Sequence, residues 1–465
     1  MAATTTSEIA QLKHKRTSTP PPAYFLSLTI ENFRCFRAEQ VLDLSDDNGR
    51  PAQWTIILGN NGVGKTTLLQ CLAGLQPNIH KPSSAMYMAR NSDSVLVPLI
   101  GYIPAHTILH EASERGDKEQ ALVRIGISVY YGSELSEARP GQRQDDFRVS
   151  YDGRDGYYVS SELDAGDTNI MGLVCYGYGA TRRMGSASLS DKRDGDPRAS
   201  LFSDDATLIN AEEWLLQADY AASKESEAQG RRARRRDQIK QLLIDLLPDV
   251  KDIQFNAGGD DEFPRVEVET HYGWVPMQSL SLGYKTLISW MVDLASHLFD
   301  RYPNSPNPLA EPAVVLVDEI DLHLHPQWQR TLIAYLTERF PNTQFIATAH
   351  SPLVVQAASD ANIVVLRREG DHVVIENDVE AVKGWRIDQV LTSDLFGLES
   401  ARPPQMDKLL QERTAILSKA RLTQRDRDRL KLLESKIGEL PTGETPADME
   451  AMDIIRQAAN LLKTK

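Results

Sequence analysis

A glycine-rich octet in the first part of the chain has the residue types and spacing of a phosphate-binding loop. It reads Gly59-Asn60-Asn61-Gly62-Val63-Gly64-Lys65-Thr66. Glycines at these positions let backbone N–H groups curve around phosphate oxygens, while Lys65 adds a positive charge and the Thr66 hydroxyl can ligate magnesium. The next residue, Thr67, is expected to face the α-phosphate. A chance glycine-rich turn is the alternative, but the full match between an expected strand and an expected helix predicts nucleotide binding.

A second motif places two carboxylates at the end of an apolar run. Val314–Val317 is continuous rather than alternating, which predicts a buried central strand, and Asp318 and Glu319 follow it directly. Ligand-binding groups gather at the carboxyl ends of parallel strands. We therefore expect Asp318 to hold the magnesium shell and Glu319 to be the general base that polarises the attacking water. Acidic residues can also simply cap the turn after a strand, but the phosphate-binding loop makes that interpretation less favoured.

A third motif, Leu280–Tyr284, carries Ser281 and Gly283 at the start of an expected apolar-faced helix. Taken alone, such a serine is most often a helix N-cap. The motif lies about 35 residues before the acidic pair, where it resembles the LSxGx signature of ABC-type ATPases, which contacts the γ-phosphate bound by a partner subunit. The helix N-terminus and the Ser281 hydroxyl can both donate to an anion. We expect Ser281 and Gly283 to contact nucleotide held by a second copy.

A fourth motif is the apolar run Gln344–Ala349, which ends in His350. An isolated histidine is usually structural. His350, however, lies 31 residues after Glu319, a distance that accommodates one crossover helix and the next parallel strand. We expect His350 to donate a hydrogen bond to the γ-phosphate and to orient the attacking water, with Glu319 and Lys65 as the other catalytic residues.

Strands and helices alternate around these motifs, which predicts an α/β fold with a mostly parallel sheet. Strands are expected within 24–36 and at 54–58, 266–270, 313–317 and 344–348, and helices at 66–75, from about 281, and within 405–437. The region 80–200 is rich in Gly, Asp, Ser and Arg, so flexible loops are expected to dominate there. Residues 210–247 form two apolar-faced helical halves interrupted by Gly230 and a basic cluster, which predicts a helical hairpin.

The expected architecture is an ABC-type P-loop NTPase head with a mixed helical insertion and a C-terminal helical element. It divides into a flexible tail (1–22), a first ATPase lobe (23–80), an irregular α/β insertion (81–205), a helical hairpin-like insertion (206–250), a second lobe with the remaining motifs (251–400) and the C-terminal element (401–465).

Composition restricts the classes of partner. The 465 residues carry a formal net charge of −14, so nucleic acid is expected to be contacted only through local basic patches. Three scattered cysteines suit neither a disulfide framework nor a zinc site, which is typical of a reducing compartment. The start of the chain lacks the apolar core of a signal peptide, and no apolar stretch of about 18 residues follows. We expect a cytoplasmic protein with no membrane contact.

Longer runs resemble one group of ATPases. VDEIDLHLHPQWQR, SLSLGYKTLISW and QFIATAHSP are similar to the bacterial AAA-15/AAA-21 group of ABC ATPases, relatives of the structural-maintenance-of-chromosomes and overcoming-lysogenization ATPases. VLTSDLFGLESARPPQMDKLL and LPTGETPADMEAMDIIRQA resemble the Septu-type anti-phage defence ATPases and their retron-associated relatives. The resemblance covers 24–77 and 278–465, with YGYGATRR (176–183) and EEWL (212–215) between them. It implies ATP and magnesium as cofactors, a homodimer or higher oligomer, and control of a separately encoded nuclease, often of the HNH type.

The chain also departs from the wider pattern. It has no long coiled coil with a zinc hook, which argues against chromosome tethering or break repair. It shows no clear Q-loop glutamine, so Arg182 or Arg183 is the candidate to reach the nucleotide instead. No acidic constellation of a TOPRIM nuclease follows residue 350, so any nuclease is expected in trans.

Three further features have weaker interpretations. His323 and His325, with Asp321 nearby, could form a metal or HNH-like centre, but a dimer-facing loop that signals nucleotide state is favoured. Five arginines could grip nucleic acid or a partner, although a basic run is usually a solvated helix face: Arg231, Arg232, Arg234, Arg235 and Arg236. A DNA repair ATPase acting on DNA ends is the main alternative function, and a transport ATPase is a weaker one.

Overall fold

The protein is described by a computed structural model covering residues 22–74, 172–185 and 196–437, with gaps at 225–228, 248, 257, 259–262, 359, 378, 380–381, 383 and 420. Five further strands are described by their backbone alone: β4 Pro77–His80, β5 Val95–Pro98, β6 Gln120–Val129, β7 Gly141–Tyr151 and β8 Tyr157–Ser161. The expected tail and the expected final helix beyond residue 438 lie outside the described residues. The chain separates into two compact units, residues 1–390 and 391–465. The division into six segments stays a prediction.

A six-stranded sheet positions the motifs. Its strand order is β18-β17-β3-β16-β15-β9, in which β17 to β9 run parallel and β18 is an antiparallel edge. Its strands are β3 Trp54–Gly59, β9 Cys175–Tyr178, β15 Ala313–Val317, β16 Thr343–Thr348, β17 Asn362–Glu369 and β18 His372–Glu376. Val317 pairs with Tyr178 on one side and Ala347 on the other. The carboxyl ends of these strands therefore meet at one edge, which confirms the expected mostly parallel α/β sheet.

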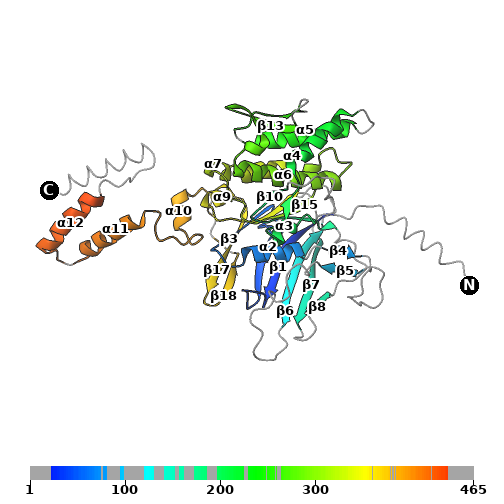
Figure 1. Ribbon diagram of the computed structural model, residues 1–465. Helices are drawn as coiled ribbons and strands as arrows, with labels where there is room; N and C mark the ends of the chain where they lie inside the picture. Colours follow the sequence, from blue (N-terminus) through cyan, green and yellow to red (C-terminus); the bar gives the residue numbers. More distant parts are fainter. Residues whose placement is uncertain are drawn as a thin grey trace, which may run out of the picture. The chain divides into compact units, whose positions relative to one another are not determined.

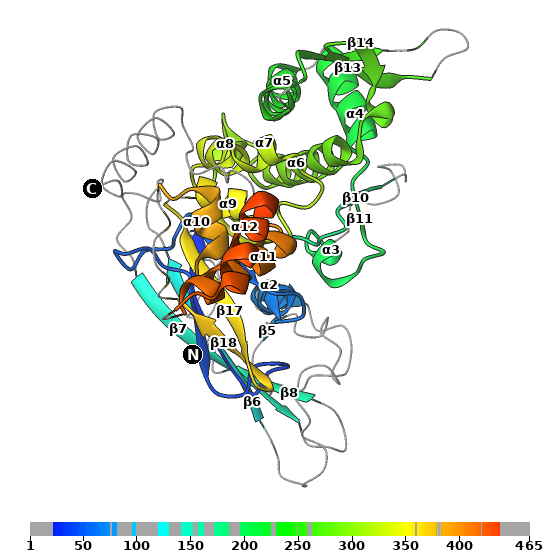
Figure 2. The same ribbon diagram turned by 90° about the vertical axis from the view of Figure 1, so that its left-hand side faces the viewer.

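The helix after the phosphate-binding loop covers one face of this sheet. α2 is described over Lys65–Gly74, and it contacts β3, β9, β15 and β16. It also contacts the short helix α3 (Ala199–Phe202), which lies next to it in Figure 2. Leu68 and Leu72 share an apolar cluster with Val314 and Leu316 of β15. All residues of β15 are buried, because the sheet is covered on both faces, and this explains the continuous apolar run.

The helical insertion packs on the long helix α6 (Leu282–Arg301). α4 (Ala211–Ser223) and α5 (Gln229–Leu246) contact each other and α6 (Figure 1), so two packed helices lie where the sequence predicts a helical hairpin. Gly230 does not interrupt it: the glycine and the basic cluster both lie inside α5. Arginine is a good helix former, and a single glycine in a first turn costs little. The antiparallel sheet β12 (Asp252–Asn256), β13 (Arg265–Thr270) and β14 (Gly273–Pro276) completes this region.

A second, antiparallel sheet corrects the expectation that loops dominate 80–200. Its order is β2-β1-β6-β7-β8, with β1 at Ala23–Glu31 and β2 at Gln40–Asp43. The polar run of β7 is held by pairing with β6 and β8, and local composition does not reveal such pairing. The strand expected within 24–36 ends at Glu31, and the next residues form a tight turn in which Phe33 and Phe36 exchange two backbone hydrogen bonds of 2.8 and 2.9 Å.

The remaining elements are small. They are β10 Arg183–Met184, β11 Thr207–Leu208, the 3-10 turns Met277–Ser279 and Pro308–Ala310, α7 Pro326–Gln329, α8 Leu332–Arg339, α9 Pro352–Ala357 and α10 Ile387–Thr392. In the second unit, α11 (Pro404–Leu417) and α12 (Gln424–Ile437) pack around Ile416, Leu430 and Leu433. None of the described helices is both long enough and apolar enough to cross a membrane.

Candidate active site

A pocket of about 460 Å³ lies where the carboxyl ends of the parallel strands meet. It is lined by Arg34, Cys35, Asn61, Gly62, Gly64, Lys65, Thr66, Thr67, Asp318, Glu319 and His350. The structure thus brings together residues from three of the four motifs. Gly64 has a φ of +91°, and a Cβ added there would lie 2.7 Å from the sulfur of Cys35. A side chain larger than hydrogen is therefore incompatible with this loop conformation.

The phosphate-binding loop (Gly59–Thr66) holds its lysine in place. The ammonium group of Lys65 donates hydrogen bonds to the carbonyl oxygens of Gly59 and Asn60 at 2.8 and 3.0 Å. Burial lowers the pKa of Lys65, and the nearby carboxylates oppose that shift. Gly59 and Asn60 thus orient the lysine and do not line the pocket. Val63 is buried in the apolar cluster beneath the loop.

Asp318 lies at the centre of a network of short hydrogen bonds. Its carboxylate accepts from the Thr66 hydroxyl and from the Thr348 hydroxyl, both at 2.6 Å. The backbone N–H of Glu319 donates to the same Thr348 oxygen at 2.7 Å. Asp318 is only 5% exposed. Thr348 therefore ties the strand β16 to both acidic residues, a role that the sequence motif alone did not indicate.

Glu319 and His350 lie at the open side of the site. Glu319 has a φ of +48°, which is uncommon for a residue with a side chain. His350 is exposed, and its backbone N–H donates to the Asp321 carboxylate, at 3.1 Å to the nearer oxygen. Both residues line the pocket. A carboxylate and an imidazole are the groups that can accept a proton from water and orient it.

The signature segment, Leu280–Tyr284, is not part of this pocket within one chain. Ser281 occupies the N-cap position of α6, yet its exposed side chain makes no capping hydrogen bond. The alternative that it serves only as an N-cap is therefore not supported. Gly283 is buried, and a Cβ there would lie 2.4 Å from the carbonyl oxygen of His323. This contact joins the signature segment to the loop after the acidic strand.

The two histidines after the acidic strand have different surroundings: His323 lies in a turn, and His325 directly precedes α7. The His325 side chain accepts a hydrogen bond from the backbone N–H of Gln327 at 3.3 Å, as the N-cap of α7. His323 is exposed. In the part of the chain that the structure describes, no group of three or more His, Cys, Asp or Glu residues could hold a metal. A role of Asp321 and His323 across an interface stays a prediction.

Two arginines have positions that sequence reasoning did not establish. Arg34 lines the pocket, and its guanidinium donates to the hydroxyl of Thr67 at 2.9 Å and to the side chain of Gln70 at 3.2 Å. The only signal in the sequence is its place in the turn after β1. Arg182 is buried behind the acidic pair, whereas Arg183 is exposed, and neither lines the pocket.

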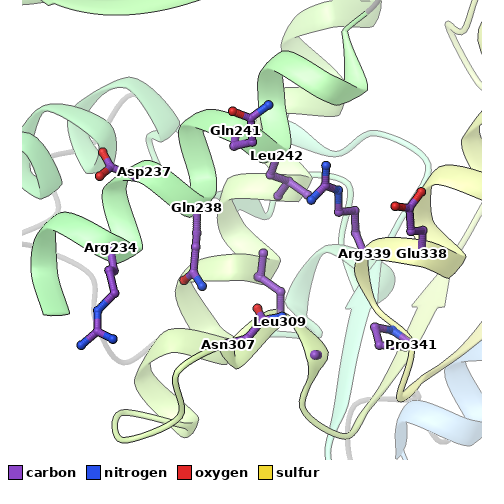
Figure 3. Close-up of a pocket in the computed structure, with 11 residues that line it drawn as sticks. Arg234, Asp237, Gln238, Gln241, Leu242, Asn307, Leu309, Glu338, Arg339 and Pro341 are labelled. Carbon is purple, nitrogen blue, oxygen red and sulfur yellow. The ribbon is translucent and has the colours of Figure 1, made fainter.

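A second pocket, of about 580 Å³, lies between α5 and the end of α8 (Figure 3). Two of its polar side chains make contacts within the chain: Arg339 pairs with Asp245, and Gln238 donates to the carbonyl of Pro306 at 3.1 Å. No phosphate-binding loop or acidic strand contributes to its lining. We therefore place the candidate active site in the first pocket.

Two arginines of the basic cluster on α5 make contacts within the chain. Arg235 donates to the carbonyl of Phe299 at 2.9 Å, and Arg236 pairs with Asp219 at 2.9 Å. These contacts hold α5 to α6 and to α4. The predicted contact with nucleic acid through this cluster stays untested.

A family model described as "AAA domain, putative AbiEii toxin, Type IV TA system" matches residues 55–356. The chain belongs to this family. The match runs from β3, which leads into the phosphate-binding loop, to α9, which follows His350, and so contains all four motifs. A second model, described as "AAA domain", matches residues 27–75.

Three curated proteins confirm the resemblance to Septu and retron ATPases. The Septu protein PtuA of Bacillus mycoides is 25% identical over 425 residues, which are 88% of this chain and 50% of that protein. The Retron Vc95 probable ATPase of Vibrio cholerae is 28% identical over 367 residues, 67% of this chain and 68% of that protein. The Retron Ec83 probable ATPase of Escherichia coli is 40% identical over 135 residues, which are 29% of this chain and 24% of that protein. The chain thus spans half the length of the Bacillus mycoides relative.

Among solved structures, an SMC head bound to the C-winged helix domain of ScpA aligns with 76% of this chain and 97% of its own, at 16% identity. The TM-score is 0.41.

Proposed function

We propose that this chain binds and hydrolyses ATP, releasing ADP and phosphate. The observation that carries the proposal is the convergence of Lys65, Thr66, Asp318, Glu319 and His350 around one pocket. A cationic loop beside two carboxylates and an imidazole is the set of groups that phosphoryl transfer to water requires. Membership of the AAA-domain family and the ATPase names of the retron relatives support the same reaction.

The residues present fit magnesium as well as the nucleotide. The Thr66 hydroxyl and the Asp318 carboxylate are oxygen donors 2.6 Å apart, and magnesium prefers such ligands together with phosphate oxygens. These two residues would hold the ion, which would neutralise charge on the phosphates when bound. No cluster of protein ligands is needed for this arrangement, because in such sites the ion keeps several waters.

The chemistry of the protein side chains follows from their positions. Backbone N–H groups of the phosphate-binding loop and the Lys65 ammonium stabilise the negative charge that develops on the phosphate oxygens. Glu319 accepts a proton from the attacking water, and the proton is released to solvent after the P–O bond to ADP breaks. His350 orients that water and donates to the γ-phosphate, as the sequence predicts.

A second copy of the chain completes the ATP site of the first. The side chain of Ser281 is exposed and makes no capping hydrogen bond, and Ser281 does not line the pocket of its own chain. Two copies arranged head to tail would place each Ser281 over the nucleotide of the other, so that ATP binding drives a homodimer or a higher oligomer. Hydrolysis would then open this assembly.

The biological role we propose is that of an ATPase subunit of a bacterial anti-phage defence system. It would regulate a separately encoded nuclease, with the HNH type favoured by the resemblance to Septu and retron ATPases. Opening and closing of the assembly would be transmitted through the helical insertion or the C-terminal helices.

Two measurements test this function together. Phosphate release by the wild-type protein should be lost in Glu319→Gln while ATP binding is retained, because the amide cannot accept the proton. Light scattering of Glu319→Gln with ATP and magnesium, with and without the co-expressed neighbouring gene product, should show a stable ATP-dependent oligomer that retains the nuclease. Hydrolysis at the normal rate in Glu319→Gln, or a protein that stays monomeric with ATP, would contradict the proposal.

A further inference from the structure

Arg182 is a buried cation that the proposed reaction does not yet use. It is 2% exposed, follows the edge strand β9 in the segment YGYGATRR, and has a φ of +31°. A charged side chain is rarely placed so deeply without a specific partner. The strained backbone and the burial together indicate that its surroundings fix it in one position.

The partners of Arg182 are the backbone carbonyls of the two acidic residues. One terminal nitrogen of the guanidinium donates to the carbonyl oxygen of Asp318 at 2.7 Å, and the other donates to that of Glu319 at 2.8 Å. Hydrogen bonds from a charged donor are short and roughly twice as strong as neutral ones. The fork of the guanidinium thus spans two successive peptide groups at the end of β15.

Other groups hold the N–H side of the same two peptides. The backbone N–H of Glu319 donates to the Thr348 hydroxyl at 2.7 Å, and that of Ile320 donates to the backbone carbonyl of Thr348 at 2.9 Å. With Arg182 on the carbonyl side, both peptide groups are fixed from two directions. This explains how Glu319 keeps a φ of +48°, an uncommon conformation that persists only where the surroundings impose it.

We propose that Arg182 is a positioning residue, which holds the backbone of Asp318 and Glu319 so that the Glu319 carboxylate points at the attacking water. The inference rests on the proposed hydrolysis of ATP. Arg182 does not line the pocket, so it acts through Glu319 and not by touching nucleotide. This replaces the expectation that Arg182 or Arg183 reaches the nucleotide.

The environment of Arg182 is consistent with a permanent charge. Burial lowers its pKa to about 10, against the raising effect of Asp318, Asp321 and Glu319, so it stays protonated at neutral pH. Its guanidinium also lies over the ring of Trp290 in α6, 5.9 Å from the ring centre. The helix that begins at the signature segment therefore supports the same arginine.

The test is Arg182→Lys, which keeps the charge but replaces the planar fork with one nitrogen on a flexible stem. We expect kcat for ATP hydrolysis to fall about 10- to 100-fold, as a misplacement of about 1 Å can do, with ATP affinity by equilibrium binding within about twofold of wild type. Arg183→Lys is the matched control, because the neighbouring arginine is exposed, and it should keep wild-type kcat. A variant with wild-type kcat, or an equal loss of affinity and kcat, would overturn the inference.

A second variant covers the case in which lysine is not accommodated in the buried site. Arg182→Ala, assayed with and without added guanidinium ion, should regain kcat when the ion fills the space. Activity that stays low with the ion present would refute the positioning role. Absence of hydrolysis by the wild-type protein would instead refute the proposed function itself, so the two failures are distinguishable.

Discussion

The Thr348 hydroxyl provides the sharpest test of the network around the acidic pair. Thr348→Val keeps the shape of the side chain but removes a donor to the Asp318 carboxylate at 2.6 Å and an acceptor of the Glu319 N–H at 2.7 Å. A hydrogen bond to a charged group contributes about 1.5–3 kcal/mol, and a neutral one about 0.5–1.5 kcal/mol. We therefore expect the free energy of unfolding to fall by roughly 2–4.5 kcal/mol.

Thr343→Val is the matched control, since it makes the same change on the same strand. Thr343 is fully buried, and in the described part of the chain its hydroxyl has no hydrogen-bond partner. Removing an unpaired buried hydroxyl should leave stability unchanged or raise it.

Denaturant unfolding followed by tryptophan fluorescence suits this comparison, because all six tryptophans lie in the unit of residues 1–390. The signal therefore reports on that unit alone. Thr348→Val should also hydrolyse ATP at least about tenfold more slowly, because Glu319 loses one of its backbone anchors. Equal unfolding midpoints for the two valine variants would show that the hydroxyl network has no energetic role.

Three further predictions follow from other contacts. Gly283→Ala should lower the free energy of unfolding by about 1–3 kcal/mol by overpacking, since its methyl group would meet the His323 carbonyl at 2.4 Å; an unchanged denaturation midpoint would argue against this contact. Gly64→Ala should weaken ATP binding at least about tenfold in calorimetry, since the loop at φ +91° would have to change shape. Burial lowers the pKa of His297, but the Asp293 carboxylate outweighs this and the net pKa is raised. The added stability is therefore complete below about pH 6.5 and is lost as the pH rises through the folded pKa, so the stability gap between wild type and His297→Gln should narrow above that pH.

Contiguous motifs were predictable from the sequence because each carries its own local signal. The phosphate-binding loop, the continuous apolar run before Asp318 and the apolar strand before His350 each combine a residue pattern with an element type. Their convergence follows from a general rule for parallel sheets. The hydrogen bond between Thr66 and Asp318 joins residues 252 positions apart, and it was anticipated only through their shared role at a metal.

Residues that act on the backbone of others left no such signal. Thr348 ends strand β16 and Arg182 follows strand β9, and both contact the acidic pair. Their spacing in the sequence does not indicate these contacts. The antiparallel sheet was missed for a related reason: its polar strand β7 is stabilised by neighbours far along the chain and not by its own propensity.

Single-turnover hydrolysis by a mixture of two inactive variants tests the shared site most directly. Lys65→Ala disables the phosphate-binding loop, and Ser281→Arg disables the signature segment. In a head-to-tail pair of one chain of each kind, one site combines the intact loop of the Ser281→Arg chain with the intact serine of the Lys65→Ala chain. We predict that each protein alone is inactive and that the mixture releases phosphate. A mixture as inactive as its components would contradict a site built from two chains.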